Sequence, residues 1–324
     1  MRVAVTDFTF PSLDIEEAVL SPLGIDVVGH QCKSSDELVA AVRAADAVLT
    51  QFAPVTGEVI GAMDAARVIV RYGIGVDNVD LVAARERGVP VCNVPAYCLD
   101  EVADHTVAFI LSATRRVLAN CLHVRKGEWG LPVSLNDMCA LRDLTVGIVG
   151  FGRIGREVAA RLRPFKCRLL VCDPVVGDDV VTTSGCELSS FDDLLTASDV
   201  ISLHCPSSPE TRKLFDAEAF ARMKPGAVLV NLARGDLVDT DALIGALESG
   251  RLGAAALDVC DPEPIPTDSP LRRLENVVVS SHVASASAVA VEELRKTAAG
   301  IAADVLQGRA PINVVNGVGE KAHE

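Results

Sequence analysis

A glycine-rich turn between two apolar segments has the clearest chemical meaning in this sequence. Residues 145–173 read TVGIVGFGRIGREVAARLRPFKCRLLVCD, which predicts a strand, a tight turn, an amphipathic helix and a second strand that ends at an acid. Gly150 suits the turn, Gly152 would let a pyrophosphate approach the backbone, and Gly155 would let the helix pack closely on the strand. This order of elements predicts a bound dinucleotide.

The residues around the turn indicate which dinucleotide. Arg153 and Ile154 would open the helix, whose free N–H groups would point at the phosphates. Asp173 stands at the tip of the second strand, where a carboxylate accepts hydrogen bonds from the ribose hydroxyls and repels a 2′-phosphate. No Lys or Arg follows Pro174 closely, although a 2′-phosphate site usually supplies such a cation. The sequence therefore favours NAD over NADP.

Three further polar residues follow apolar segments in the same half of the chain. Arg234 lies in NLARG (231–235), Glu263 in LDVCDPEP (257–264) and His282 in SSHVA (280–284). In a parallel sheet these strand ends meet at the edge that binds ligands. An arginine fork matches a carboxylate, and an imidazole with an ordinary pKa of about 6.5 donates a proton near neutral pH. The three residues together suit the reduction of a 2-oxo acid.

The chain resembles the D-isomer-specific 2-hydroxyacid dehydrogenases, a family that includes phosphoglycerate dehydrogenase and the C-terminal binding protein corepressors. The resemblance covers nearly the whole length and rests on several strings in the family's order. These are RYGIGVDNVD (71–80), EVADHTVAFIL (101–111), GIVGFGRIGREVA (147–159), HCPSSPETR (204–212), NLARGDLVD (231–239), ALDVCDPEP (256–264) and SSHVA (280–284).

The resemblance implies an NAD-dependent oxidoreductase that interconverts a 2-oxo acid and a D-2-hydroxy acid by hydride transfer. Arg234 would bind the substrate carboxylate, His282 would be the general acid/base, and Glu263 would orient the imidazole. Several relatives have proline at the position of Ser281, and an aromatic residue is common at the position of Cys260. These departures leave the choice of substrate open.

Further site residues are expected from the resemblance. The turn with Tyr72, Ile74 and Gly75 would contact the substrate, because its N–H groups suit a carboxylate. Two roles are equally open for Asp258, a contact to the nicotinamide and a cap at the end of its strand. Beyond the glycine turn and Asp173, the expected cofactor contacts are Thr106, Cys205, Pro206, Thr211, Ala233, Asp258 and Ala284.

Elements that position these residues can be predicted from periodicity. Residues 2–95 alternate apolar runs (VAVTDF, AVLT, VIVR, VPVCNV) with helical stretches, which predicts a parallel α/β unit. From residue 145 the runs TVGIV, RLLVC, VISLH, AVLVN, AAALDV and VVVS predict a doubly wound sheet. One long helix is predicted over residues 99–125. The last helix, about 288–306, is expected to pack on the first lobe.

The fold class is therefore α/β with two parallel-sheet lobes. The resemblance implies a flavodoxin-like substrate-binding domain and a doubly wound Rossmann domain for NAD. The predicted domains are residues 1–95 plus 296–324, which bind substrate, and residues 96–295, which bind the dinucleotide.

Composition limits the partners. A formal charge of −14 argues against a nucleic-acid surface, and the sequence has no apolar stretch long enough to span a membrane. No secretory h-region is visible, so we expect a cytoplasmic protein. The ten cysteines form no Cys-x-x-Cys pair, and neither a metal site nor a disulfide is predicted.

Two further expectations concern association. A homodimer is expected through residues 99–140, because the segment around Trp129 has more apolar surface than one lobe needs. The alternative function is an NAD-sensing, corepressor-like interaction module with little turnover. The presence of the Arg, Glu and His set favours an enzyme.

Overall fold

The computed structural model describes residues 1–319 of the 324-residue chain. It contains two compact units, one formed by Met1–Tyr97 with Ser287–Glu324 and the other by Cys98–Ala286. The predicted boundary at 295/296 falls inside the last helix, whereas the structure divides the chain at Ser287, directly before that helix. The predicted substrate-binding domain extends to 324, so its last five positions, 320–324, lie outside the described residues.

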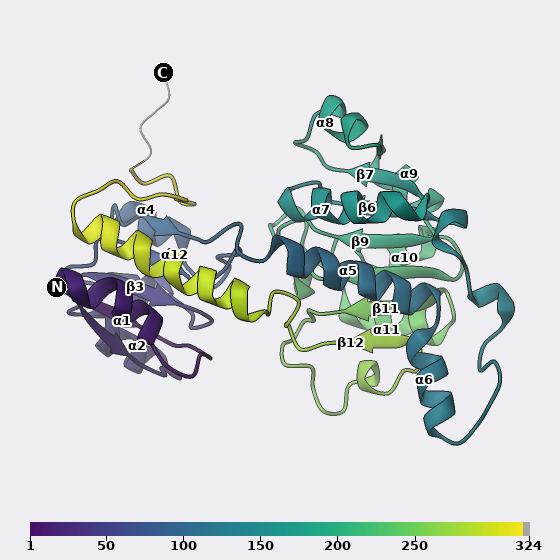
Figure 1. The fold of residues 1–324 in the computed structure, drawn as a ribbon, viewed down its shortest axis with the longest axis horizontal. Helices are drawn as coiled ribbons and strands as arrows, with labels where there is room; N and C mark the ends of the chain where they lie inside the picture. The colour runs from purple at the N-terminus through teal and green to yellow at the C-terminus, as the bar shows by residue number, and fades with distance from the viewer. Residues whose placement is uncertain (320–324) are drawn as a thin grey trace. The chain divides into compact units, whose positions relative to one another are not determined.

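The first unit, which contains the N-terminus marked in Figure 1, is built on a five-stranded parallel sheet in the order β2-β1-β3-β4-β5. This is the flavodoxin-like order, with its switch point between β1 and β3. Apolar runs predicted four of the strands, and the structure adds the half-exposed edge strand β2. The strands are β1 (Arg2–Val5), β2 (Asp26–Gly29), β3 (Ala47–Thr50), β4 (Ile69–Arg71) and β5 (Val91–Cys92).

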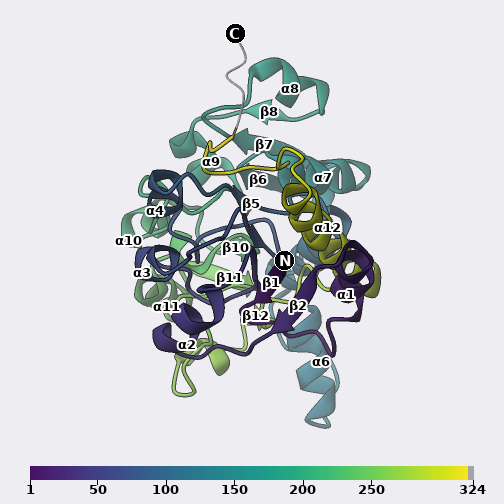
Figure 2. The same cartoon turned by 90° about the vertical axis from the view of Figure 1, so that its left-hand side faces the viewer.

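Helices cover both faces of this sheet because successive strand residues point to opposite sides. Val3 and Val5 pack with Leu294 of the last helix, whereas Ala4 packs with Leu38 and Val59 of two other helices. Figure 2 shows the helices on the two sides. They are α1 (Asp14–Leu20) and α12 (Ala288–Leu306) on one face, and α2 (Ser35–Val42), α3 (Gly57–Gly61) and α4 (Leu81–Glu86) on the other.

The second unit has a seven-stranded parallel sheet in the order β12-β11-β10-β9-β6-β7-β8. Counted from β6, this is the doubly wound order with the switch point between β6 and β9, as in a Rossmann domain. The strands are β6 (Thr145–Val149), β7 (Arg168–Cys172), β8 (Glu187–Leu188), β9 (Val200–Leu203), β10 (Ala227–Asn231), β11 (Leu252–Leu257) and β12 (Val277–Val279).

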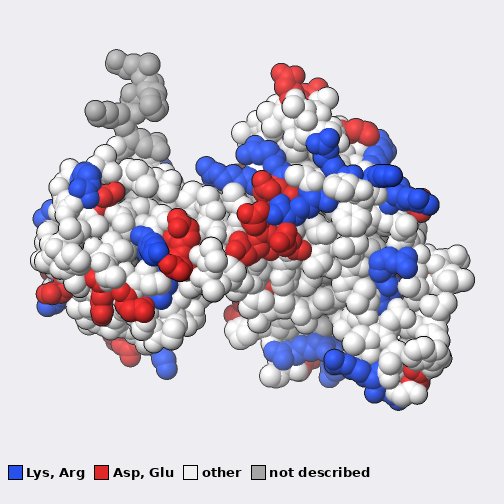
Figure 3. Space-filling view, in the orientation of Figure 1, with Lys and Arg blue, Asp and Glu red and all other residues white. Residues whose placement is uncertain are grey.

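Seven helices accompany this sheet. The helix α5 packs against α7, and the Arg161 guanidinium of α7 bonds to Asp104 Oδ1 of α5 at 2.6 Å and to Glu157 Oε2 at 2.7 Å. Acidic and basic side chains are intermixed on the face of this unit that carries α5 (Figure 3). The helices are α5 (Leu99–Thr114), α6 (Val117–Arg125), α7 (Arg153–Leu162), α8 (Asp178–Thr183), α9 (Phe191–Ala197), α10 (Ala217–Arg222) and α11 (Thr240–Glu248).

The single long helix predicted over residues 99–125 is wrong. It breaks into α5 and α6, which are bent by 63°, because Arg116 adopts a left-handed conformation with φ 52°. The Arg116 guanidinium donates to the Gly253 carbonyl at 2.8 Å and so anchors the break to β11. No single helix within residues 1–319 is long and apolar enough to cross a membrane, although the bent pair together reaches that length and composition.

Candidate functional site

The loop after β6 has the geometry of a phosphate cradle. Gly150 has φ +92°, and a Cβ there would lie 2.4 Å from the backbone N of Cys205 in the loop after β9. A Cβ on Gly155 would lie 2.3 Å from the Gly150 carbonyl oxygen. By contrast, no heavy atom lies within 4 Å of the Cβ position of Gly152, which is the N-cap of α7. Since no side chain caps α7, its first N–H groups fit a pyrophosphate.

Asp173 follows β7 and lies beside this loop. Its carboxylate accepts the Phe151 N–H at 2.7 Å and the N–H groups of Val175 and Val176 at 2.8 and 3.0 Å. Burial acts to raise its pKa, but these N–H groups and the charge of Arg156 outweigh burial and hold the pKa below its usual value. The side chain is half-buried and retains acceptor capacity for ribose hydroxyls.

Other predicted cofactor residues lie around the same switch point. Arg153 is exposed at the first turn of α7, and Ile154 beside it is half-buried. Burial raises the pKa of the Cys205 thiol to about 11, which leaves it an uncharged side chain next to Gly150. In the loop after β9, the Thr211 hydroxyl donates to the Pro206 carbonyl at 2.7 Å and thereby shapes the loop itself.

Thr106 does not have the geometry that was expected of it. Its side chain is fully buried, and its hydroxyl donates to the Val102 carbonyl at 2.7 Å within α5. A hydroxyl carries one proton, so this internal bond leaves no donor for a phosphate. We therefore leave Thr106 out of the candidate cofactor residues.

Arg234 lies in the loop after β10, and that loop is tightly held. The buried side chain of Asn231 donates to the Arg234 carbonyl at 2.8 Å and accepts the Ala233 N–H at 3.0 Å. Arg234 Nη1 donates to the Ala233 carbonyl at 2.6 Å. A Cβ on Gly235 would lie 2.0 Å from the Cys260 carbonyl oxygen, so this loop is in close contact with the one after β11.

Glu263 and His282 meet directly. The distance between Glu263 Oε2 and His282 Nδ1 is 3.0 Å, and Glu263 Oε1 accepts the Cys260 N–H at 2.9 Å. Burial acts to raise the pKa of Glu263, but the bonds from His282 and Cys260 outweigh it and leave the pKa below the ordinary glutamate value. Both side chains are 38% exposed, so the pair is open to a ligand.

Asp258, at the end of β11, behaves as a strand-end cap. Its side chain is 2% exposed. Oδ1 accepts the Val283 N–H and Oδ2 accepts the Ala284 N–H, each at 2.9 Å. Of the two readings weighed from the sequence, the geometry favours the cap over direct contact with a nicotinamide, because the carboxylate faces the loop that carries His282.

The turn after β4 belongs to the first unit. Tyr72 is 2% exposed, and its hydroxyl donates to Glu16 Oε1 at 3.0 Å. The Tyr72 side chain therefore belongs to the core, and its N–H donates to the Thr50 carbonyl at 2.8 Å. The expected contact of this turn with substrate stays a prediction. Ile74 and Gly75 are half-buried, and within residues 1–319 their N–H groups have no hydrogen-bond partner. Asn93 fixes the turn by donating to the Ile74 carbonyl at 2.6 Å.

Sequence reasoning missed two residues that support the site. Asn231 ends the apolar run AVLVN, and Ser280 follows the run VVV. A polar residue at the carboxyl end of a buried strand was the available signal. The same signal predicts Arg234 and His282, and it applies equally to the residues that hold their loops.

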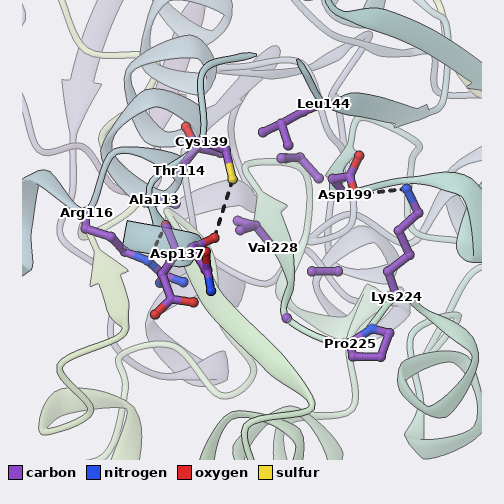
Figure 4. A pocket seen from close by; sticks show the side chains of 14 residues that line it. Ala113, Thr114, Arg116, Asp137, Cys139, Leu144, Asp199, Lys224, Pro225 and Val228 are labelled. Atoms are coloured by element: carbon purple, nitrogen blue, oxygen red, sulfur yellow. Dashed lines mark hydrogen bonds and ion pairs between the residues drawn. The ribbon is translucent and has the colours of Figure 1, made fainter. Parts of the chain in front are cut away.

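A separate cavity of about 250 Å³ lies at the opposite edge of the same sheet, where β9 and β10 begin. Figure 4 shows Lys224 directed at Asp199 on one side and Arg116 beside Asp137 on the other. The ion pair between Lys224 Nζ and Asp199 Oδ1 measures 2.8 Å. This cavity is distinct from the glycine loop and from the predicted site residues.

A doubly wound parallel sheet with a glycine cradle at its switch point defines a dinucleotide-binding protein. Comparison with known proteins supports the same class. Residues 107–284 match the family described as D-isomer specific 2-hydroxyacid dehydrogenase, NAD binding domain. The chain is 38% identical over 299 residues to a glyoxylate reductase of Thermofilum pendens, covering 90% of this chain and 88% of that protein.

Two other relatives complete the comparison. A D-3-phosphoglycerate dehydrogenase of Mycobacterium leprae is 44% identical over 255 residues, which are 78% of this chain and 48% of that protein. The crystal structure of a D-lactate dehydrogenase from Aquifex aeolicus, complexed with NAD and lactic acid, superposes with a TM-score of 0.85 at 28% identity. That match covers 95% of this chain and 96% of the other.

The chain therefore belongs to the D-isomer-specific 2-hydroxyacid dehydrogenase family, a family of NAD-dependent oxidoreductases. Residues 107–284 are its NAD-binding domain, and NAD is the cofactor. The chain spans about half the length of the phosphoglycerate dehydrogenases that it matches.

Proposed function

We propose that this protein interconverts a 2-oxo acid and a D-2-hydroxy acid with NAD. The observation that carries the proposal is the Glu263–His282 pair at the strand ends that also present the Arg234 loop. Bound NAD supplies the two-electron step by giving or accepting a hydride at C4 of its nicotinamide. The protein must then hold the substrate carboxylate and move one proton at the carbonyl oxygen.

His282 is the proposed general acid/base. A carboxylate only accepts hydrogen bonds, so the Nδ1 proton of His282 points at Glu263. Nε2 is then the atom that gives its proton to the substrate oxygen as the ketone becomes an alcohol, and that takes the proton back in the reverse direction. The negative charge of Glu263 stabilises the protonated ring that begins reduction.

Arg234 is the proposed carboxylate ligand. A guanidinium gives two parallel charge-assisted hydrogen bonds to a carboxylate, which fixes the orientation of the neighbouring carbonyl. The contacts of Asn231 with the Arg234 loop support this role, because they hold the backbone of the arginine in place. The turn of the first unit with Ile74 and Gly75 stays a predicted carboxylate contact.

The cofactor contacts that we propose are those the geometry supports. Gly150, Gly152 and Gly155 shape the pyrophosphate cradle, and Asp173 receives the ribose hydroxyls. The remaining proposed contacts lie on the loops around the switch point: Arg153, Ile154, Cys205, Pro206 and Ala233.

Steady-state kinetics test this proposal. Purified protein with NADH should oxidise NADH in the presence of at least one member of a panel of glyoxylate, pyruvate, hydroxypyruvate and bulkier 2-oxo acids. H282A and R234A should each lower kcat/KM by about 10²- to 10⁴-fold while NADH still binds. Tight NADH binding without turnover on any member of the panel would contradict catalysis and favour the corepressor-like alternative.

We also propose a homodimer that associates through residues 99–140. The helix α6 has no buried residue, although much of it is apolar. Trp129 is 91% exposed and Leu135 is 73% exposed, which is a large cost for a monomer in water. Sedimentation at micromolar concentration should give the mass of a dimer, and W129S should shift it towards the monomer. A wild-type monomer at that concentration would contradict this assignment.

A further inference from the structure

The loop that carries His282 is held in an unusual conformation. His282 has φ 57°, in the left-handed region that non-glycine residues rarely adopt. Its own N–H donates to the Asp258 carbonyl at 2.8 Å, and the next two N–H groups donate to the Asp258 carboxylate. Such strain persists only where the surroundings over-determine it. The three hydrogen bonds to Asp258 hold the loop in this conformation.

Asp258 is itself held by a serine on the same loop. The Ser280 hydroxyl bonds to Oδ1 of Asp258, and the Ser280 N–H donates to the Leu257 carbonyl at 3.0 Å. Because a carboxylate only accepts, the single hydroxyl proton of Ser280 is given to Asp258. The oxygen of Ser280 is then available only as an acceptor.

That acceptor faces His105 of α5. The distance between His105 Nε2 and Ser280 Oγ is 3.3 Å, and the direction of the serine proton makes Nε2–H of His105 the donor. The His105 ring is fixed by an edge contact with Phe109, with ring centroids 4.5 Å apart. A chain of hydrogen bonds therefore runs from His105 through Ser280 to Asp258.

We propose that His105 and Ser280 are positioning residues for the catalytic histidine. They fix the carboxylate of Asp258, and through it the loop 280–284 that presents His282 to Glu263. Neither residue needs to touch substrate or cofactor. The proposal rests on the role assigned to His282, and it adds a second histidine, from a different element, to the groups that position the catalytic one.

The neighbouring serine provides a matched control. Ser281 is exposed and, within residues 1–319, makes no side-chain hydrogen bond, whereas Ser280 joins two other residues. S280A should lower kcat by about 10- to 100-fold, because a misplaced catalytic group is costly. S281A should leave kcat unchanged within about twofold, and S280T, which keeps the hydroxyl, should recover most of the activity. NADH affinity and Tm are measured in parallel.

His105 is tested in the same way. H105L removes the donor to Ser280 and should lower kcat by about 3- to 30-fold, whereas H105Q keeps an N–H donor and should recover part of it. A purely structural role predicts loss of Tm in step with loss of kcat. A positioning role predicts reduced kcat with NADH affinity preserved and Tm close to that of S281A.

A spectroscopic readout keeps this test separate from the proposed activity. The Nδ1 proton of His282, bonded to Glu263, should give a downfield proton resonance that is absent in H282A. It should persist in S281A and S280T, and shift or broaden in S280A and H105L. An unchanged resonance and unchanged kcat in S280A would overturn the inference. If the wild type has no turnover at all, the proposed function fails while the resonance still decides whether the loop depends on Ser280.

Discussion

The proposed proton transfer depends strongly on one residue property, the negative charge of Glu263. E263Q keeps an oxygen that accepts the His282 Nδ1 proton but removes the negative charge that favours the protonated ring. We expect kcat for reduction to fall about 10- to 100-fold with a smaller change in NADH affinity. Steady-state kinetics with NADH titrations measure both. An E263Q enzyme with wild-type kcat would show that the ion pair has no part in proton transfer.

The lowered pKa of Glu263 gives a pH prediction with a definite sign. A carboxyl whose pKa is lowered on folding contributes stability that is complete above its ordinary value of 4.5 and is lost as pH falls through the lowered folded pKa. The difference in Tm between wild type and E263Q should therefore be largest above about pH 5 and shrink in more acid solution. A difference that grows on acidification would contradict the lowered pKa.

Tyr72 and Thr106 show the limit of prediction for single residues. Both stand in strings that match the family, yet their hydroxyls donate to Glu16 and to the Val102 carbonyl. The direction in which a side chain points depends on tertiary packing, which one sequence does not reveal. Glu263 and His282 were predictable as a pair because each follows a strand at the same edge of the sheet.

At the level of elements, the turn from β6 into α7 requires glycine at position 150. G150A would place a Cβ in a left-handed backbone, 2.4 Å from the Cys205 N. We expect unfolding free energy to fall by at least about 1–3 kcal/mol and NADH affinity to fall by roughly tenfold or more. Chemical denaturation and NADH titration measure these changes.

A second glycine gives the opposite expectation and serves as control. Gly245 lies within α11, and its Cβ position is open. G245A should raise stability by about 0.5–1 kcal/mol, because alanine favours a helix, and should leave NADH binding unchanged. Equal losses in both variants would mean that the loop geometry is not the cause.

The helices α1 and α12 of the first unit are joined by a buried ion pair. Arg295 bonds to both carboxylate oxygens of the fully buried Glu16, with Nη2 to Oε2 at 2.6 Å. R295A would leave the Glu16 charge unpaired and should cost about 3–5 kcal/mol of unfolding free energy. The apolar triple change E16L, R295M and Y72F should cost much less, because it removes the three buried polar side chains together and leaves only the exposed Asp14 carboxylate of the cluster. A larger loss in the triple variant than in R295A would contradict this view.

The elements that the sequence patterns failed to predict were missed for physical reasons. The edge strands β2 and β8 are exposed or half-exposed, so neither has the apolar run that marks a central strand. The break between α5 and α6 depends on the bond of Arg116 to Gly253, a long-range contact that leaves the local periodicity intact. Central strands such as β6 and β10 were predictable because both faces are buried.

Two parallel sheets and the NAD-binding domain could be predicted for the molecule as a whole. The alternation of strands and helices indicated the sheets, and the glycine turn with Asp173 indicated the dinucleotide, in agreement with the family match over residues 107–284. The substrate could not be predicted, because the chain is similar both to a glyoxylate reductase and to D-3-phosphoglycerate dehydrogenases, which are named for different substrates.

Transfer of isotope from cofactor to product tests the central claim most directly. Wild-type protein is incubated with NADH deuterated at C4 on the transferred face and with each 2-oxo acid of the panel, and the product is analysed by mass spectrometry and chiral chromatography. We predict one deuterium at C2 of a D-2-hydroxy acid, and no labelled product with H282A. Unlabelled product, an L-hydroxy acid, or equal labelling by H282A would contradict the proposed reaction.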